Sequence, residues 1–219
     1  MSDAARARLD RYVALLLAGN ERANLTAARD AEAVAAHVAD ALTIAPYVEG
    51  ALVDVGSGGG LPGIPLAIVL GVPLTLIESV GKKARFLREA VAALELDATV
   101  VEARAEEAGR DPALRERFRS ATARAVGTLP TVLELTLPLL AVGGAAVLQR
   151  GALDERERVA AADAARMLGG EVVVEHVIDG ERRVVLVRKV APTAARFPRR
   201  SGVPAKRPLC LGPRAGTPA

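Results

Sequence analysis

One short segment constrains the fold of this chain more than any other. Residues 54–63 read DVGSGGGLPG and directly follow the apolar run Ala51-Leu52-Val53. An apolar strand that runs into a glycine-rich turn and then a helix is how open α/β sheets bring a ligand close to the backbone. Glycine suits such a turn because it bends tightly and places no Cβ in the way of the ligand. The segment therefore predicts a ligand-binding loop in an open α/β sheet.

The spacing of the glycines narrows the kind of ligand. A dinucleotide fingerprint that begins at Gly56 requires a glycine where this chain has Leu61, and a phosphate-binding loop that begins at Gly58 requires a lysine where it has Ile64. The remaining pattern, acid-x-Gly-x-Gly-x-Gly, begins at Asp54 and is similar to the cofactor loop of S-adenosylmethionine (AdoMet) methyltransferases. A plain tight turn is the other interpretation of such a loop.

A second acidic residue supports the functional interpretation. Residues 73–78, PLTLIE, predict the next strand, and Glu78 stands at its carboxyl end, 24 residues after Asp54. This offset is close to that at which an acid meets ribose hydroxyls in open α/β sheets. The two oxygens of one carboxylate match two hydroxyls on one ribose. The alternative is an exposed acid at a strand end, without a ligand.

Length and composition bound the class of protein. A chain of 219 residues with 51% apolar residues is most simply one domain with decorations. No apolar run approaches the roughly 20 residues of a membrane-spanning helix, and the first residues have no signal-peptide core. A single cysteine, Cys210, fits a reducing compartment. We therefore expect a cytoplasmic protein that does not bind a membrane.

The charge of the chain is divided between an acidic body and a basic tail. From Arg182 onward there are ten Lys or Arg residues and no Asp or Glu, whereas the preceding residues hold all 26 acidic and 19 of the 29 basic side chains. Basic tails usually bind polyanions, because each contact with a phosphate releases counterions; a solubilising end is the alternative. Aromatic residues make up only 2% of the chain, so contact with nucleic acid should be electrostatic and shape-based.

The periodicity divides the chain into three parts. Two helices, over residues 3–18 and from Asp30 to about Pro46, are expected to form an N-terminal helical cap at 1–48. Alternating strands and helices follow at 49–189, and a basic tail rich in Pro and Gly, without periodicity, occupies 190–219.

The alternation predicts a mostly parallel sheet that is covered by helices on both faces. The expected strands lie near 51–55, 73–78, 98–102, 121–126, 144–149, 171–178 and 183–188, and the expected helices near 63–70, 82–95, 112–118, 129–140 and 153–167. Only Asp179-Gly180-Glu181 joins the last two strands, which indicates a hairpin, so the seventh strand should run antiparallel.

The motifs together resemble one family, the bacterial small-subunit ribosomal RNA methyltransferase G, also called the glucose-inhibited division protein B family. The resemblance extends from about residue 20 to 209. It rests on Asn24-Leu25-Thr26, Arg29-Asp30, His37-Val38-Ala39-Asp40, Ala45-Pro46-Tyr47, 54–68, 78–89, Arg104-Ala105-Glu106, Arg124-Ala125-Val126, Leu129-Pro130 and the basic segment 192–209. The core alone would indicate a methyltransferase; the core and the tail together indicate this family.

The resemblance implies a Rossmann-like, seven-stranded AdoMet-dependent methyltransferase that methylates N-7 of guanine 527 in 16S ribosomal RNA. Its partner would be that RNA or the small ribosomal subunit, and a monomer is expected. Guanine N-7 carries a lone pair and no proton, so the reaction needs no general base. The rate would come from holding the methyl donor and N-7 in line.

Site residues are carried over by the same resemblance. Arg124 matches an active-site or cofactor-side arginine, an ordinary surface arginine being the alternative. The cofactor-binding residues would be Gly56, Gly58, Gly60, Leu61, Glu78, Ala105, Glu106 and Arg124. Apart from the resemblance, basic side chains give the candidate RNA-binding residues Lys82, Lys83, Arg150, Arg199, Arg200, Lys206 and Arg207. For Lys82 and Lys83, an ordinary solvated helix face is an equal alternative.

Some features depart from the family or point to other functions. Arg119 stands where members commonly have an acid, and Gln149-Arg150 where they commonly have lysine, which leaves substrate contacts there open. The two histidines, His37 and His176, are too few to indicate a metal site. An AdoMet enzyme for a small molecule remains the alternative function, followed by a binding module without turnover. A nicotinamide oxidoreductase is disfavoured by Leu61.

Overall fold

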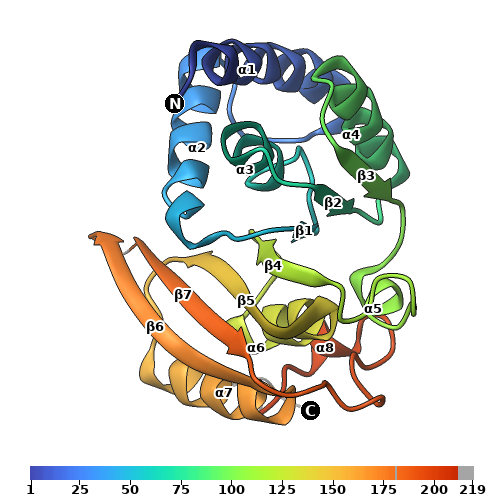
Figure 1. Ribbon diagram of the computed structural model, residues 1–219. Helices are drawn as coiled ribbons and strands as arrows, with labels where there is room; N and C mark the ends of the chain where they lie inside the picture. The colour runs from blue at the N-terminus through green and yellow to red at the C-terminus, as the bar shows by residue number, and fades with distance from the viewer. Residues whose placement is uncertain (181, 212–219) are drawn as a thin grey trace.

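The computed structural model describes residues 1–180 and 182–211 of the chain, and its centre is one seven-stranded sheet (Figure 1). The strands are β1 (Leu52–Val55), β2 (Leu74–Ile77), β3 (Ala98–Val101), β4 (Phe118–Ala123), β5 (Leu140–Arg150), β6 (Gly170–Asp179) and β7 (Arg182–Lys189). Their order is β3-β2-β1-β4-β5-β7-β6, and β7 runs antiparallel to both of its neighbours while the other pairs are parallel. The predicted fold and its antiparallel seventh strand are confirmed; of the predicted hairpin turn, Glu181 lies outside the described residues.

Helices cover both faces of the sheet. On one face lie α2 (Ala31–Leu42), α3 (Gly63–Leu70) and α4 (Gly81–Ala93), with α1 (Asp3–Ala23) packed outside them; η1 (Ala45–Tyr47) leads into β1. On the other face lie α5 (Ala105–Ala108), α6 (Leu129–Thr136), η2 (Leu137–Leu139) and α7 (Glu155–Met167). Side chains along β1 alternate between the two apolar cores, Leu52 packing with the first group and Val53 and Val55 with the second. Within the described ranges, no helix has the length and apolar character needed to cross a bilayer.

The first helix is longer than its sequence predicts. We expected it to end before Gly19, but α1 continues to Ala23 and ends at Asn24, which adopts a left-handed conformation (φ 50°). Gly19 is needed for close packing, because a Cβ there would lie 2.5 Å from the ring of Phe86 on α4. The glycine that resembles a helix stop is therefore a contact point between two helices.

The prediction of a helix at 112–118 is wrong. The segment forms turns, Glu116 has a positive φ of 55°, and β4 already begins at Phe118. The guanidinium of Arg115 donates hydrogen bonds to the carbonyl oxygens of Gly109 and Phe197, at 2.8 Å each. Contacts with a distant part of the chain thus override the local helical preference, and the fourth strand starts earlier than predicted.

The segment after the sheet packs on the body of the protein. Lys189, fully buried at the end of β7, donates to the carbonyl of Leu137 at 2.7 Å and to the hydroxyl of Thr193. Phe197 and Leu209 are buried in the core beneath α6 and α7. A short helix, α8 (Val203–Lys206), lies beside α6. Of the predicted tail at 190–219, residues 212–219 lie outside the described part of the chain.

Candidate functional site

The predicted ligand loop lies where the direction of the sheet order reverses. β1 pairs with β2 on one side and with β4 on the other, so the chain moves outward from β1 to β3 and then returns to β4. Such a reversal opens a crevice beyond the carboxyl ends of the two central strands. The glycine loop that follows β1 and Arg124, which follows β4, both lie at this crevice.

The glycine loop forms the floor of a cavity of about 370 Å³. Gly56, Gly58 and Gly60 all have positive φ angles, of 70°, 57° and 95°. A Cβ at Gly58 would have only the Gly56 carbonyl oxygen within 4 Å, at 3.9 Å, so a side chain there would extend into the cavity. The cavity is lined by Leu25, Thr26, Ala27, His37, Gly56, Ser57, Gly58, Gly59, Leu61, Glu78, Lys83, Arg124 and Ala125. The loop thus offers bare backbone to a ligand.

The first helix holds this loop in place from below. The buried hydroxyl of Tyr12 on α1 donates a hydrogen bond of 2.8 Å to the carbonyl oxygen of Gly59. Leu16 and Leu25 approach Gly59 so closely that a Cβ there would lie 2.8 Å and 3.3 Å from them. The hydroxyl of Ser57 donates to the carbonyl oxygen of Asp54 at 2.8 Å. The N-terminal helix is therefore a support for the site.

Backbone N–H groups hold both oxygens of the Glu78 carboxylate. Its side chain is 6% exposed; Oε2 accepts the backbone N–H of Gly58 at 2.9 Å, and Oε1 accepts that of Val80 at 2.7 Å. Each oxygen keeps a lone pair after these bonds. The carboxylate can therefore accept two more hydrogen bonds from a vicinal diol, as the predicted ribose role requires.

Asp54, the first acid of the loop motif, has a different position. It is fully buried, and its Oδ2 accepts the backbone N–H of Gly63, the first residue of α3, at 3.2 Å. Its Oδ1 has no hydrogen-bond partner among the described residues. Burial is the main cause that raises the pKa of this carboxyl to about 7, and the Gly63 amide opposes the shift. Asp54 thus supports the loop from inside the fold.

A second cavity, of about 170 Å³, adjoins the first at Gly56. Its walls carry the apolar side chains of Val55, Ile77 and Val126, together with the predicted pair Ala105-Glu106. Glu106 is 7% exposed, and its Oε1 accepts the backbone N–H of Gly202 at 2.8 Å. Gly202 and Ala205 of the C-terminal segment also line this cavity. Sequence reasoning missed both, because no local pattern links them to the loop.

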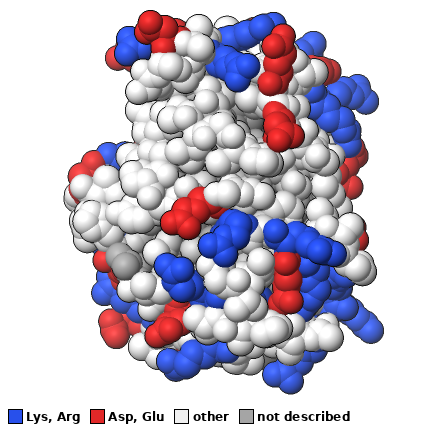
Figure 2. Space-filling view, viewed as in Figure 1, with Lys and Arg blue, Asp and Glu red and all other residues white. Residues whose placement is uncertain are grey.

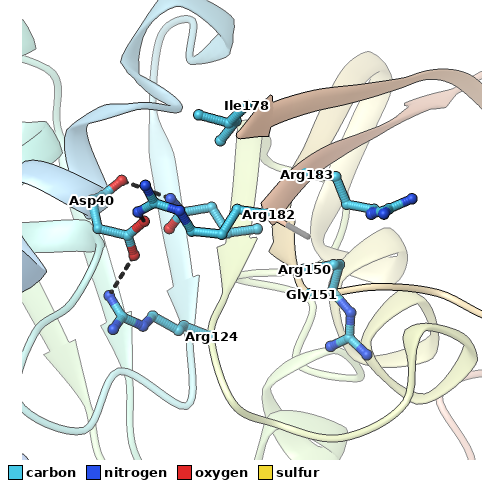
Figure 3. Close-up of a pocket in the computed structure, with 8 residues that line it drawn as sticks. Asp40, Arg124, Arg150, Gly151, Ile178, Arg182 and Arg183 are labelled. Atoms are coloured by element: carbon cyan, nitrogen blue, oxygen red, sulfur yellow. Dashed lines mark hydrogen bonds and ion pairs between the residues drawn. The ribbon is translucent and has the colours of Figure 1, made fainter. Parts of the chain in front are cut away.

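A third cavity, of about 200 Å³, is lined by arginines and shares Arg124 with the first (Figure 3). Arg124 and Arg182 reach Asp40 on α2 from two sides: Arg124 Nη1 lies 3.4 Å from Oδ2, and Arg182 Nη1 donates to Oδ1 at 2.7 Å. Arg124 Nη1 is buried and has no hydrogen-bond partner among the described residues. Arg150 and Arg183 complete the basic lining. Four arginines in the lining of one cavity favour a ligand with a phosphate or carboxylate group.

The predicted RNA-binding residues fall into two groups. Lys82 on α4 and Arg200, Lys206 and Arg207 on the C-terminal segment are exposed, and Lys83 borders the first cavity. Figure 2 shows Lys and Arg side chains gathered over α4 and over the C-terminal segment beside α5 and α8.

The second group is held by internal partners. Arg150 donates to the carbonyl of Gly127 at 2.8 Å and to Glu157 at 3.1 Å. Arg199 forms a close ion pair with the fully buried Glu134 on α6, at 2.6 Å. The structure therefore gives Arg199 an internal partner, and its contact with RNA stays a prediction.

The departures from the family pattern are structurally accommodated. Gln149 Nε2 donates to the carbonyl oxygen of Asp40 at 2.6 Å and to the hydroxyl of Thr43 at 2.9 Å, which joins β5 to α2. Arg119 is exposed, 3.9 Å from Glu49. In the part of the chain that the structure describes, no group of three His, Cys, Asp or Glu residues could hold a metal ion.

Comparison with known sequences finds close relatives over most of the chain. A profile of the family described as rRNA small subunit methyltransferase G matches residues 5–185. The chain is 48% identical to the ribosomal RNA small subunit methyltransferase G of Roseiflexus castenholzii, an alignment that covers 91% of this chain and 89% of the relative. It is 44% identical to the protein of the same name from Chloroflexus aggregans, over 95% of this chain and 92% of the relative.

Solved structures share the fold at low sequence identity. The mitomycin 7-O-methyltransferase MmcR superposes with a TM-score of 0.55 at 16% identity, covering 71% of this chain and 54% of that chain. M. jannaschii TYW2, solved in complex with AdoMet, gives a TM-score of 0.52 at 17% identity and covers 69% of this chain and 73% of that chain. The sheet is thus that of a Rossmann-like methyltransferase.

Proposed function

Because the chain belongs to the rRNA small subunit methyltransferase G family, we propose that it transfers a methyl group from AdoMet to N-7 of guanine 527 in 16S ribosomal RNA. Membership makes the chain a methyltransferase of small-subunit ribosomal RNA. We add the methyl donor, the base and the acceptor atom to that assignment. Such a substrate would place the protein in the cytoplasm, where ribosomes are assembled.

The position of Glu78 between two cavities is the observation that supports AdoMet as the methyl donor. Glu78 lines the first cavity, the next residue, Ser79, lines the second, and Gly56 lines both. A ligand with a ribose in the middle would place its diol on Glu78 and its base in the apolar second cavity, beside Ala105. Its amino-acid end would lie over the glycine loop, where Arg124 can pair with a carboxylate. These three groups are those of AdoMet.

The proposed reaction requires the chain to orient the methyl donor relative to the acceptor base. AdoMet, when bound, supplies an activated methyl group on a sulfonium. Because guanine N-7 carries no proton, no side chain has to remove one. The task of Gly58, Glu78 and Arg124 is therefore to hold the donor so that its methyl faces the acceptor at near-attack distance.

The acceptor would approach from the arginine-lined third cavity. Arg124 borders this cavity and the first, so a nucleotide whose phosphate lies among the arginines could place its base over the glycine loop. In the free protein, the Asp40 carboxylate pairs with Arg124 and Arg182. An RNA phosphate can replace it as their partner, since both are anionic oxygen acceptors.

A methyl-transfer assay tests the proposal. Labelled AdoMet is incubated with small ribosomal subunits from a strain that lacks the native enzyme, and the labelled nucleoside is identified. We expect 7-methylguanosine in 16S RNA with the wild type, no label with Gly58→Asp and reduced label with Arg124→Ala. An aspartate at Gly58 would project into the cavity and repel the donor's carboxylate.

The matched control is Gly71→Asp. Gly71 also has a left-handed conformation (φ 65°), but a Cβ there meets nothing within 4 Å. Gly71→Asp therefore measures the effect of backbone strain from a glycine-to-aspartate substitution, without a side chain in the cavity. No label in RNA, with AdoMet binding intact, would overturn the proposed acceptor and favour a small-molecule substrate.

A further inference from the structure

The C-terminal segment reaches the second cavity and lines it. Gly202 and Ala205 lie among its lining residues, together with Val55 and Ile77 at the carboxyl ends of the central strands. We propose that residues 199–207 form a wall of the cofactor site that contacts the purine ring of AdoMet. We propose also that RNA bound to the outer face of this wall strengthens cofactor binding. The inference rests on the proposed use of AdoMet and RNA.

Hydrogen bonds attach the wall to the helices beside the cavity. The backbone N–H of Gly202 donates to Glu106 on α5, at 2.8 Å. The hydroxyl of Thr131 on α6 donates to the carbonyl oxygen of Pro204, at 3.0 Å. Glu106 and Thr131 are both buried, so these bonds are shielded from water. The wall therefore has a defined position relative to the cavity.

A buried ion pair fixes the start of the wall. The guanidinium of Arg199 donates to both oxygens of Glu134, with Nε at 2.8 Å from Oε1 and Nη2 at 2.6 Å from Oε2, and the backbone N–H of Arg199 donates to Oε1 at 2.8 Å. Arg199 Nη2 also donates to the carbonyl oxygen of Arg207, at 2.7 Å, which joins the two ends of the segment. Glu134 is fully buried, so separating this pair would leave a buried charge without a partner.

The inner face of the wall suits a flat, largely apolar group. Gly202 and Ala205 are small, and the lining of the same cavity includes the aliphatic side chains of Val55, Ile77 and Val126. Ligand pockets of this kind combine apolar walls with a few polar groups that fix orientation. A purine ring fits this description, and Ser79 and Glu106 provide polar groups in the lining.

The outer face of the same segment is basic. Arg200, Lys206 and Arg207 are exposed, and no ion-pair partner for their side chains occurs in the described ranges. Lys206 directly follows Ala205, so one short helix carries a cavity-lining residue and a phosphate-binding candidate next to each other. An RNA phosphate outside and a purine inside would thus hold the same segment in place.

Linkage makes the two binding events mutually favourable. If RNA binds better when the wall is docked, and AdoMet binds better when the wall is docked, each ligand increases the affinity for the other by the same factor. The element that both ligands bias is the docked segment 199–207.

The wall is tested by AdoMet titration calorimetry on the full chain without RNA. Ala205→Leu places a larger side chain at the cavity, and we expect it to weaken AdoMet binding by about tenfold or more, equivalent to about 1.4 kcal/mol. The control is Ala195→Leu, the same substitution at an exposed position that precedes the wall and lies outside the cavity, which should bind as the wild type does. Thermal unfolding checks that both variants are folded. If they then bind AdoMet with equal affinity, the proposal that residues 199–207 form a wall of the cofactor site is overturned.

The coupling is tested by repeating the titration with saturating, unmethylated 16S RNA transcribed in vitro. Wild type should bind AdoMet more tightly with RNA, whereas the triple variant R200Q/K206Q/R207Q should bind it equally with and without RNA. An unchanged wild-type affinity would overturn the coupling. If Ala205→Leu weakens AdoMet binding while no methyl reaches RNA, the wall stands and the proposed acceptor fails, so the two proposals are distinguishable.

Discussion

Asp54 is a buried carboxyl group whose surroundings disfavour its charged form. Between its ordinary pKa near 4 and about 7, the folded protein keeps a proton on Asp54 that the unfolded chain has released. The free energy of unfolding should therefore fall as the pH rises through this window, by up to about 1.4 kcal/mol per pH unit for this group. Asp54→Asn keeps an acceptor for Gly63 but cannot ionise.

Thermal unfolding between about pH 5 and pH 7 measures this effect. The melting temperature of Asp54→Asn should depend less on pH than that of the wild type. The exposed Asp97→Asn is the control and should follow the wild type. If all three proteins show the same pH dependence, Asp54 is charged throughout the window and the argument is wrong.

Tyr12 gives a second prediction at the same scale. Tyr12→Phe removes the hydroxyl that donates to Gly59 and leaves the ring in place, so we expect a loss of about 1 kcal/mol in the free energy of unfolding. Since the bond fixes the glycine loop, AdoMet affinity should also fall. Chemical denaturation and calorimetry measure the two effects. Tyr47→Phe, at a partly exposed position on η1, is the control, and an equal result for both variants would contradict the supporting role.

At the scale of elements, the ion pair between Glu134 on α6 and Arg199 joins the C-terminal segment to the body of the protein. Glu134→Ala leaves the Arg199 guanidinium without its buried partner, and we expect a loss of about 3 kcal/mol in the free energy of unfolding. Limited proteolysis should then cut within 190–211. The control Glu89→Ala removes an exposed partner 4.0 Å from Arg22, a surface pair worth at most about 1 kcal/mol. A protease-resistant Glu134→Ala protein would show that the segment is held by other contacts.

The elements also show what could be predicted from sequence. The order of the seven strands, the loop at 54–63 and the position of Glu78 follow from periodicity and spacing, which are local properties. The continuation of α1 through Gly19 and the turns at 112–116 depend on Phe86 and on carbonyls of the C-terminal segment. Such tertiary contacts leave no local pattern, and for the same reason Gly202 and Arg182 were missed as cavity residues.

At the scale of the whole molecule, the basic tail is also part of the core. Phe197 and Leu209 are buried, so deleting residues from 190 onward would remove packing together with charge. A test of RNA binding should therefore neutralise exposed side chains. We expect the RNA affinity of the wild type to fall steeply with salt. The triple variant R200Q/K206Q/R207Q should have a slope smaller by about 0.7 to 0.9 for each phosphate that it no longer neutralises.

Filter binding across a series of salt concentrations measures these slopes. The matched control is the triple variant R6Q/R8Q/R11Q on the exposed face of α1, which changes the net charge equally. If both variants reduce the slope alike, net charge decides RNA binding and the location of the basic groups does not.

The docking of residues 199–207 against α5 and α6 also sets an order of assembly. The glycine loop and all seven strands leave the ribosome before Gly202 does, so a growing chain can fold its sheet while the purine cavity still lacks one side. The cofactor site is then completed only when synthesis has passed the sheet. A message truncated within this segment would encode every strand of the described sheet but would lack a wall of the cofactor site and, with Leu209, part of the core.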